Sequence, residues 1–377
     1  MSFLRLRAVA RKEFLHIRRD PRSLAIALVL PLVALLLFGW ALTLDVDRIP
    51  TYVYDRDGTP ESRAMIDQFR GSRYFDVRGY VHTYAPVDVD VDRSRILLAI
   101  VVPRDFGRAV QEGREADIQA IFDGSDSNTA AIALGYTQGV VSAYAARLRS
   151  DAQVRRGAGK LKAAVDPRVR VLYNADLKSK NFIVPGLIAV TMMIIAAMLT
   201  SLTVAREWET GTMEQLLSTP VRPVELILGK LSAYFALGIA DMVTCVVVGV
   251  FVFGVPLRGS VWFLFFSSCL FLFGALCLGI LVSTLARSQL LAYQLGVLTS
   301  FLPGFLLSGF IYSIENMPKA IQAVTYIVPA RYFVTILKGV FLKGAGIQIL
   351  ATETAFLAVY AIVVAGIAVR KMRQKVA

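Results

Sequence analysis

Residues 181–205 read NFIVPGLIAVTMMIIAAMLTSLTVA, a run of 25 positions without a charged side chain. A helix needs about 20 apolar residues to cross the hydrocarbon core of a bilayer, and a helix satisfies its own backbone groups there. Five further runs have spanning length, two of them interrupted by a single acid (Asp241 or Glu353): residues 23–44, 231–257, 259–286, 288–314 and 344–369. The sequence therefore predicts a membrane α-helical protein with six transmembrane helices.

The first run, residues 23–44, is predicted to remain in the mature chain as the first transmembrane helix. Its 22 residues exceed the length of the apolar region of a signal peptide. Asp45, Asp47 and Arg48 follow it, where a cleavage site would need small residues. We therefore interpret this run as a span and not as a removed leader.

The net charge of +13 at pH 7 is concentrated beside the ends of the predicted spans. Residues 45–180 hold 21 basic and 19 acidic side chains, whereas residues 1–22 hold seven basic residues and residues 370–375 hold four. Basic residues beside span ends are typical of the cytoplasmic side of membrane proteins. We therefore expect both termini in the cytoplasm, residues 45–180 outside, and a lipid bilayer in place of nucleic acid as the charged partner.

Cysteine and histidine give no sign of a catalytic or metal site. Cys245, Cys269 and Cys277 all fall within predicted spans, so no disulfide is expected in the outer region. The two histidines, His16 and His82, are too few for a histidine-rich metal site. The motif Asp123-Gly-Ser-Asp126 resembles part of a calcium loop, but it lacks the later bidentate Glu, which favours a turn and a helix cap.

Two segments flank the first span. Residues 1–22 carry the pattern FxxLxxVxxxxFLxI with basic residues between, which predicts an amphipathic interfacial helix that ends at Asp20-Pro21. Residues 45–180 are predicted to form an extracytoplasmic α/β domain of about five strands, inserted between the first and second spans. The expected strands are 51–54, 75–81, 96–102, 117–122 and 169–173, and helices are expected from Thr59-Pro60-Glu61 and over 105–113 and 127–148.

The remainder, residues 181–377, is predicted to form a transmembrane domain of five helices with two polar connections. The inner connection, residues 206–230, contains Gly211, which permits a sharp turn. Thr212 with Gln215 three positions later forms a capping-box pattern, and Met213, Leu216 and Leu217 would share one face of a short helix. Such a helix could dock into a soluble partner or serve as an ordinary interfacial linker. Residues 315–343 lie outside, where two short helices are expected.

The inner connection closely resembles the signature E-x-E-x-G-T-x-E-x-L-x-x-T-P of the ABC type-2 transporter permeases. The matching residues are Glu207, Glu209, Gly211, Thr212, Glu214, Leu216, Thr219 and Pro220. Arg11-Lys12-Glu13-Phe14 is similar to the interfacial helix of the family, and Pro329-Ala-Arg331-Tyr332-Phe333 is similar to its motif before the sixth span. The large outer domain resembles that of the multidrug exporter permeases.

This resemblance implies a half-transporter of the bacterial inner membrane. It implies a second permease, identical or related, and a cytoplasmic ATPase that binds ATP-Mg and contacts the residues named above together with Leu217. It also suggests a periplasmic adaptor on the outer domain. No GxxxxGK[ST] phosphate loop occurs, and Gly157-Ala-Gly159-Lys160 lacks the required spacing, so the sequence predicts a transport subunit that is not itself an enzyme and binds no cofactor.

Asp241 lies in the middle of the third predicted span, where a carboxyl is expensive to bury and therefore suggests a function. It could lie on the substrate path or carry a proton; the alternative is a hydrogen-bonded Asp, with Thr244 as one candidate partner. Glu353 lies nearer a span end, where either snorkelling to the membrane surface or a bond to Thr352 or Thr354 is expected.

Two other functions remain open at this point. A membrane-anchored sensor would use the outer domain to bind a ligand, but it should also carry an output domain larger than the inner connection. A secondary transporter would usually show internal repeats and several charged or broken spans, whereas we find no clear repeat and a single mid-span acid, Asp241.

Overall fold

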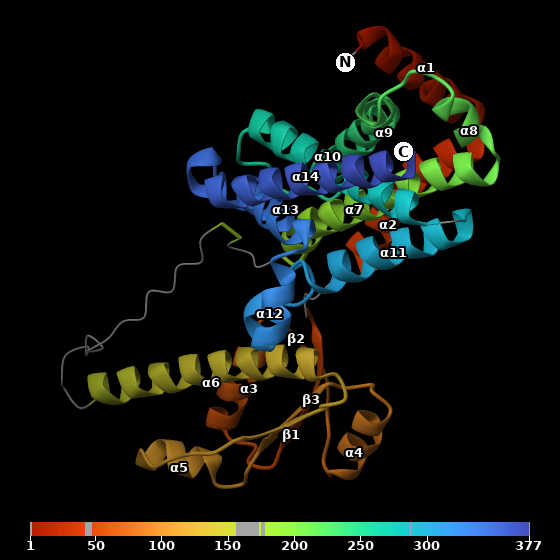
Figure 1. Ribbon diagram of the computed structural model, residues 1–377. Helices are drawn as coiled ribbons and strands as arrows, with labels where there is room; N and C mark the ends of the chain where they lie inside the picture. The colour runs from red at the N-terminus through yellow and green to blue at the C-terminus, as the bar shows by residue number, and fades with distance from the viewer. Residues whose placement is uncertain (1, 42–46, 156–172, 175–177, 287, 377) are drawn as a thin grey trace. The chain divides into compact units, whose positions relative to one another are not determined.

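The computed structural model describes residues 2–41, 47–155, 173–174, 178–286 and 288–376 (Figure 1). The chain divides into two compact units, which we call the helical unit (Met1–Thr43 with Val171–Ala377) and the α/β unit (Leu44–Arg170). Most of the chain is helical, and the sheet is confined to the α/β unit.

The helical unit contains apolar helices long enough to cross a membrane. Its elements are α1 (Phe3–Arg19), α2 (Pro21–Ala41), α7 (Lys180–Glu209), α8 (Thr212–Leu217), α9 (Pro223–Phe251), α10 (Val261–Leu285), α11 (Gln289–Leu306), α12 (Lys319–Thr325), α13 (Pro329–Lys338) and α14 (Ile347–Val376). Within the described residues, α7, α9, α10, α11 and α14 meet the length and hydropathy of a span. The apolar part of α2, Ala27–Ala41, is shorter, and α12 with Pro329–Lys343 forms a pair bent by 83°. The chain is therefore a multi-pass membrane protein.

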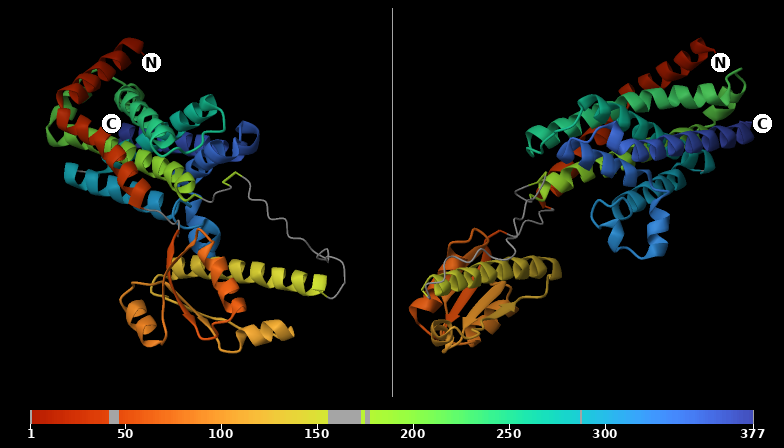
Figure 2. Two further views of the ribbon diagram at one scale, coloured as in Figure 1. Left: turned by 180° about the vertical axis from the view of Figure 1, so that it is seen from behind. Right: turned by 90° about the vertical axis from the view of Figure 1, so that its left-hand side faces the viewer.

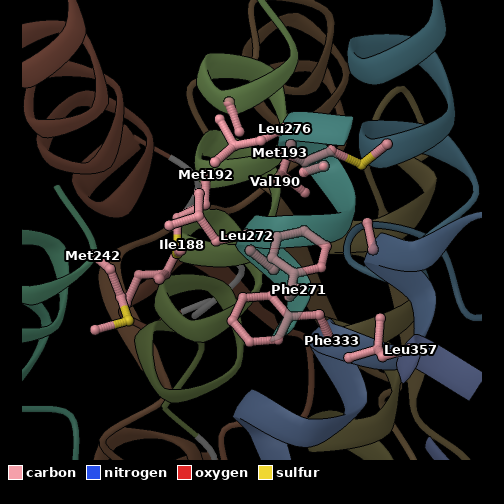
Figure 3. Close-up of a cluster of buried hydrophobic side chains, with 14 of the residues drawn as sticks. Ile188, Val190, Met192, Met193, Met242, Phe271, Leu272, Leu276, Phe333 and Leu357 are labelled. Atoms are coloured by element: carbon pink, nitrogen blue, oxygen red, sulfur yellow. The ribbon is translucent and has the colours of Figure 1, made fainter. Parts of the chain in front are cut away.

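Helix α7 lies at the centre of the helical unit and packs against α2, α9, α10, α11 and α13 (Figures 1 and 2). Figure 3 shows the buried cluster that joins four of these helices, with Ile188 and Met192 from α7 beside Met242, Leu272 and Leu276. The ring of Phe271 stacks on that of Phe333, with centroids 4.1 Å apart and planes within 13°.

Small residues bring the helices around α7 close together. A Cβ atom on Gly279 would lie 2.0 Å from Thr200 Oγ1 and 2.5 Å from the Ala197 carbonyl oxygen. The Thr200 hydroxyl donates to the Leu276 carbonyl at 3.0 Å, and the Ser283 hydroxyl oxygen accepts backbone N–H groups of α7. Close backbone approach and interhelical hydrogen bonds are the main attractive contacts between helices in lipid.

The segment before α14 folds into the two short helices that the sequence predicts. Arg331 lies at the start of α13, with its guanidinium 3.9 Å from the centroid of the Tyr326 ring, and it donates to the Thr325 hydroxyl. Lys338, at the end of α13, donates to the Gly309 carbonyl at 2.9 Å and lies over the ring of Phe182. These cations join the bent pair to its own loops and to α7.

The α/β unit contains a four-stranded sheet in the order β2-β1-β3-β4, with β1 parallel to β2 and β3 and with β4 antiparallel to β3. Its elements are β1 (Ile49–Asp55), α3 (Pro60–Arg70), β2 (Phe75–Tyr80), α4 (Ala85–Asp92), β3 (Leu98–Val102), α5 (Phe106–Glu112), β4 (Gln119–Phe122) and α6 (Ser127–Arg155). Every residue of β3 is buried, as expected for a central strand covered on both faces. Helix α3 begins at Pro60, as predicted, and Thr59 caps it by accepting from the Ser62 N–H.

The structure bears on one predicted strand and on one acidic run of the α/β unit. Four strands are described, because most of the expected strand over 169–173 falls outside the described residues. The acidic run at Asp88, Asp90 and Asp92 is helical, as α4, and Asp88 and Asp92 are exposed. Asp90 is engaged, accepting from the Tyr52 hydroxyl at 3.0 Å and pairing with Arg95 at 3.4 Å. The run is helical because Val87 and Val91, which are spaced one helical turn apart, pack against the sheet.

Candidate functional site

The residues that follow α7 form a sharp bend, which we call the elbow segment (residues 209–222). Gly211 adopts a left-handed φ of +71°, so the chain reverses there and α8 begins at Thr212. The predicted capping box is wrong, because Gly211 is the residue before α8 and no side chain caps the helix. The Thr212 hydroxyl instead donates back to the Glu207 carbonyl at 3.4 Å and lies 3.0 Å from the Thr210 hydroxyl.

Beneath the elbow segment lies a set of four charged residues, which we call the charged cluster: Lys12, Glu13, Glu207 and Lys230. Lys230 Nζ is 2.9 Å from Glu13 Oε1 and 2.9 Å from Glu207 Oε1, and Lys12 also bonds Glu207. The side chains of Lys230, Glu13 and Glu207 are 1%, 6% and 8% exposed, so the cluster joins α1, α7 and α9 in a region of low dielectric.

The charges of the cluster stabilise one another. Burial alone would raise the pKa of Glu13, but the positive charges of Lys230 and Lys12 outweigh it and hold that pKa below its usual range. Burial alone would lower the pKa of Lys12, but the hydrogen bond and the negative charge of Glu207 raise it above its usual value. Both groups are therefore ionised at neutral pH, and the ion pairs are complete.

A second polar chain connects α1, α7 and the start of α11. Arg206 Nη1 lies 2.9 Å from His16 Nε2, and because guanidinium only donates, this ring nitrogen is the acceptor. Arg206 Nε donates to Gln289 Oε1 at 3.2 Å, and the Gln289 amide donates to Glu209 Oε2. Glu209 thus fixes the end of α7 to the first residue of α11.

The elbow segment is also fixed at its far end, where α9 begins. Glu225 accepts from the Arg222 N–H at 3.1 Å and from the Ser2 N–H at 2.6 Å. Arg5 donates to the Pro220 carbonyl, so the first turn of α1 is bonded to both sides of this junction.

The structure separates the nine predicted coupling residues by exposure. Six are exposed: Glu209, Gly211, Thr212, Glu214, Thr219 and Pro220. Leu216 is half-buried and Glu207 is 94% buried inside the charged cluster, while the side chain of Leu217 lies outside the described residues. Met213, fully buried, fixes α8 to the helical unit. The outward surface of the elbow segment is thus polar and acidic, and Glu207 belongs to its support.

A cavity of about 320 Å³ lies between α1, the start of α2, α7 and α9. Its polar end includes Lys12, His16 and Arg206, and its apolar end is lined by leucines at positions 24, 199, 202 and 237. A second, water-sized cavity of about 10 Å³ shares Leu199, Tyr234 and Leu237 with the first and reaches Asp241.

Asp241 is 3% exposed, and its carboxyl oxygen Oδ1 accepts from the thiol of Cys245, one turn further along α9, at 3.6 Å. The suggested bond to Thr244 is wrong, because that hydroxyl donates to the Ala240 carbonyl. The expected bond of Glu353 to a neighbouring threonine is also wrong, since Thr354 donates to Leu350 and one oxygen of Glu353 is buried without a partner among the described residues.

Within the described residues, no group of three or more His, Cys, Asp or Glu side chains is arranged to hold a metal ion. The Asp123 loop is a turn followed by a helix cap, as predicted. Hydrogen bonds from the hydroxyl and N–H of Ser125 lower the pKa of Asp123, and Asp126 accepts from the Thr129 N–H at the start of α6.

Sequence reasoning missed most of the charged cluster. Lys12 and Glu13 were noted as part of a family motif, but their pairing with Lys230 was not foreseen. One signal was available, since Glu13 is the single acid in a helix that is otherwise strongly basic.

The apolar helices of spanning length define a multi-pass membrane protein, in which the buried charged cluster joins α1, α7 and α9 beneath the exposed elbow. The chain belongs to the ABC-2 family of transporter proteins, whose family pattern it matches over residues 21–370. It is 38% identical over 376 residues to the probable multidrug ABC transporter permease YbhS of Escherichia coli K12, covering 100% of this chain and 98% of that protein. It is 32% identical to the probable multidrug ABC transporter permease YbhR of the same organism over 348 residues, 92% of each chain.

A third relative, the inner membrane transport permease YhhJ of Escherichia coli K12, is 29% identical over 312 residues, covering 80% of this chain and 78% of that protein. The chain is therefore a permease subunit of an ABC exporter, a class of transport subunits that are not themselves enzymes. The sensor interpretation is not favoured.

Proposed function

We propose that the chain is one membrane half of an ATP-driven exporter that moves a drug-like or amphipathic substrate out across the bacterial inner membrane. The substrate class follows the names of YbhS and YbhR, which are each described as a probable multidrug ABC transporter permease. A separate cytoplasmic ATPase subunit binds ATP-Mg and hydrolyses it, and this chain supplies the path.

The topology that fits this function has six spans, with α2 as the first. An even number of spans puts both termini on the same side, and the basic residues at both ends favour the cytoplasm. The α/β unit then lies outside the membrane, where it is available to a periplasmic adaptor.

A second permease, identical or related, completes the path. The helical unit leaves large apolar side chains exposed on α11 and α14, among them Leu290, Leu298, Val359 and Ile362. Such apolar faces fit either lipid or a second permease. A transport path between two halves requires that part of this surface contacts the second permease.

The observation that carries the coupling proposal is the exposed acidic surface of the elbow segment above a buried support. Glu214, Thr219 and Pro220 are exposed, whereas Met213 and Glu207 fix the same segment to α1, α7 and α9. A partner that binds this surface would therefore move α7 and its neighbours together. We assign Glu214 as the central ATPase contact, because it is exposed and its carboxylate makes no hydrogen bond or ion pair among the described residues.

The test is co-purification with the cytoplasmic ATPase after charge reversal. Glu214→Arg should reduce the recovered ATPase at least tenfold, which corresponds to about 1.4 kcal/mol. Glu112→Arg, a reversal of the same size on the exposed surface of the α/β unit, should leave recovery unchanged. Full recovery with Glu214→Arg would move the contact elsewhere, and equal loss in both variants would show a nonspecific effect.

Asp241 is the proposed substrate-path residue within the span. The two cavities are neighbours that share three lining residues, and Arg206 lines the first while Asp241 lines the second. Asp241→Asn should lower export while the permease and ATPase still co-purify, and Thr244→Val, a change at a neighbouring half-buried position, should not. Normal export by the Asp241→Asn variant would remove Asp241 from the path.

A further inference from the structure

The cavity of about 320 Å³ between α1, α2, α7 and α9 has the size of a small-ligand site. Pockets that bind small molecules commonly hold about 300–1,000 Å³, and they combine an apolar lining with a few polar groups. A water-sized group takes about 30 Å³, so this cavity has room for about ten such groups. An occupant of that size is a small molecule and neither a protein segment nor a two-chain lipid.

The lining of the cavity changes from polar to apolar along α7. Arg206, Leu202 and Leu199 are spaced by four and three residues, which puts them on one face of the helix, and all three line the cavity. The distance along the helix axis from Arg206 to Leu199 is about 10 Å, at a rise of about 1.5 Å per residue. Leu24 of α2 and Leu237 of α9 complete the apolar end. The cavity therefore fits a molecule with one polar head and one apolar chain.

Most charged groups of the lining already have partners. Lys12 and Lys230 pair with Glu13 and Glu207 in the charged cluster, which is neutral as a whole. Asp20, the remaining acid of the lining, also has a partner of its own. These groups therefore need no counterion from an occupant of the cavity.

Arg206 differs from them, because its partners carry no charge. Its guanidinium donates through Nη1 to His16 Nε2 and through Nε to Gln289 Oε1. Within the described parts of the chain, Nη2 donates to no group and no carboxylate forms an ion pair with Arg206. A guanidinium with free N–H groups binds carboxylate or phosphate oxygens, often in a bidentate manner. The head that suits this end of the cavity is therefore an anion.

We propose that this cavity binds a single-chain amphipathic anion, with its carboxylate or phosphate head at Arg206 and its chain among Leu24, Leu199 and Leu237. Resting on the proposed function, this is the site at which the exporter takes up its substrate, and the substrate class is the amphipathic anion. The neighbouring cavity at Asp241 is only water-sized, at about 10 Å³, so the bound chain ends before Asp241.

The test titrates the full-length chain in nonionic detergent with octanoate, a single-chain carboxylate of matching size, while the Tm is followed. Octanoate should raise the Tm, and octylammonium, a cation with a chain of the same length, should give little increase. Arg206→Gln should raise the octanoate concentration at half of the increase by about 10- to 100-fold, because it removes hydrogen bonds from a charged donor. Arg206→Lys keeps the charge and should recover part of the response.

A second variant tests the apolar end. Leu202→Trp fills the cavity beside the chain and leaves Arg206 in place, so it should also abolish the response, and it keeps the test valid where Arg206→Gln folds poorly. Arg104→Gln and Leu134→Trp make the same changes at exposed positions of the α/β unit and should titrate like the wild-type chain.

Two phosphate compounds separate a free single-chain molecule from a membrane lipid. Octyl phosphate should replace octanoate, whereas dioctanoyl phosphatidic acid, which has two chains, should act far more weakly. An equal response to dioctanoyl phosphatidic acid would overturn the single-chain assignment and make the cavity a lipid site. An equal response to octylammonium, or an unchanged response in Arg206→Gln or in Leu202→Trp, would overturn the binding site itself.

The role in substrate uptake is tested separately, by ATP hydrolysis in the co-purified complex of permease and ATPase. Octanoate should stimulate hydrolysis in the wild-type complex and should require a higher concentration in the Arg206→Gln complex. Octanoate that raises the Tm without changing hydrolysis would overturn the uptake role. If no ATPase co-purifies, the proposed function fails, whereas the Tm titration still decides whether the cavity binds the anion.

Discussion

Removal of Lys230 should destabilise the helical unit strongly, because its ammonium is the shared partner of two buried carboxylates. The side chain is 1% exposed and lies 2.9 Å from both Glu13 and Glu207. Lys230→Met would leave these two carboxylates with Lys12 alone, whose side chain is 49% exposed. Loss of one partner from a buried ion pair costs about 3–5 kcal/mol, since the remaining charge stays buried.

The magnitude can be separated from simple loss of packing with a double variant. Lys230→Met together with Glu13→Gln removes one positive and one negative charge, so Lys12 again balances Glu207. We expect the double variant to recover roughly 1–3 kcal/mol of the loss, within the range of coupling energies between residues in contact. Glu112→Gln, on the exposed surface of the α/β unit, should change stability by less than about 0.5 kcal/mol.

The assay is thermal unfolding of the full-length chain in detergent, with hydrogen exchange at the α1 amides as a local measure. A loss of 3 kcal/mol would increase α1 exchange on the order of 100-fold. The reasoning would be refuted if Lys230→Met cost less than about 1 kcal/mol, or if Glu13→Gln added to its cost instead of offsetting it.

Three further predictions test other parts of the structure. Gly279→Ala should lower the stability of the helical unit by about 1–3 kcal/mol, because the new methyl group meets Thr200 and a backbone carbonyl. Gly366→Ala, where nothing lies within 4 Å of the new methyl group, should be neutral or stabilising. Thermal unfolding in detergent compares the two variants, and equal effects would contradict the close packing at Gly279. Because the fold lowers the pKa of Glu13 below its usual 4.5, its stabilising charge is fully present at and above that pH and is lost as the pH falls further. The Tm difference between the wild-type chain and Glu13→Gln should therefore be constant between pH 5 and 8 and should shrink below about pH 4.5, and a difference that stays the same at lower pH would contradict this. Thr59→Ala removes the cap of α3 and should lower stability by about 1 kcal/mol. Hydrogen exchange of the α3 amides should then be roughly fivefold faster. Unchanged exchange would show that the cap contributes nothing.

The sequence predicted best those elements whose local composition already meets the requirement of the whole fold. Uncharged runs predicted α7 and α10 well, since length and hydropathy alone decide whether a helix suits a membrane. The α1 helix and its end at Asp20-Pro21 were also predicted correctly, because proline fixes the boundary. In the α/β unit, Pro60 after Thr59 located the start of α3 to the residue.

Weaker predictions concerned features that depend on contacts distant in sequence. The Thr212 and Gln215 pattern suggested a capping box, but the left-handed turn at Gly211 places Thr212 inside α8. Glu207 matched the family signature like its neighbours, yet its partners are Lys12 and Lys230, nearly 200 and more than 20 residues away respectively. A motif gives residue types and spacing, and it does not say which residues tertiary packing will bury.

The separation of exposed and buried signature residues has a mechanical consequence. Elbow residues such as Glu214 are available to a partner, while Glu207, seven positions earlier, is bonded to helices α1 and α9 through two lysines. Helix α7, which carries Glu207, also packs against α2, α10, α11 and α13. Densely packed helices transmit displacement because their side chains cannot be compressed. A displacement of α8 therefore has to move α7 against its neighbours or break the charged cluster. Because breaking the buried ion pairs of the cluster is costly, we expect α7 to move.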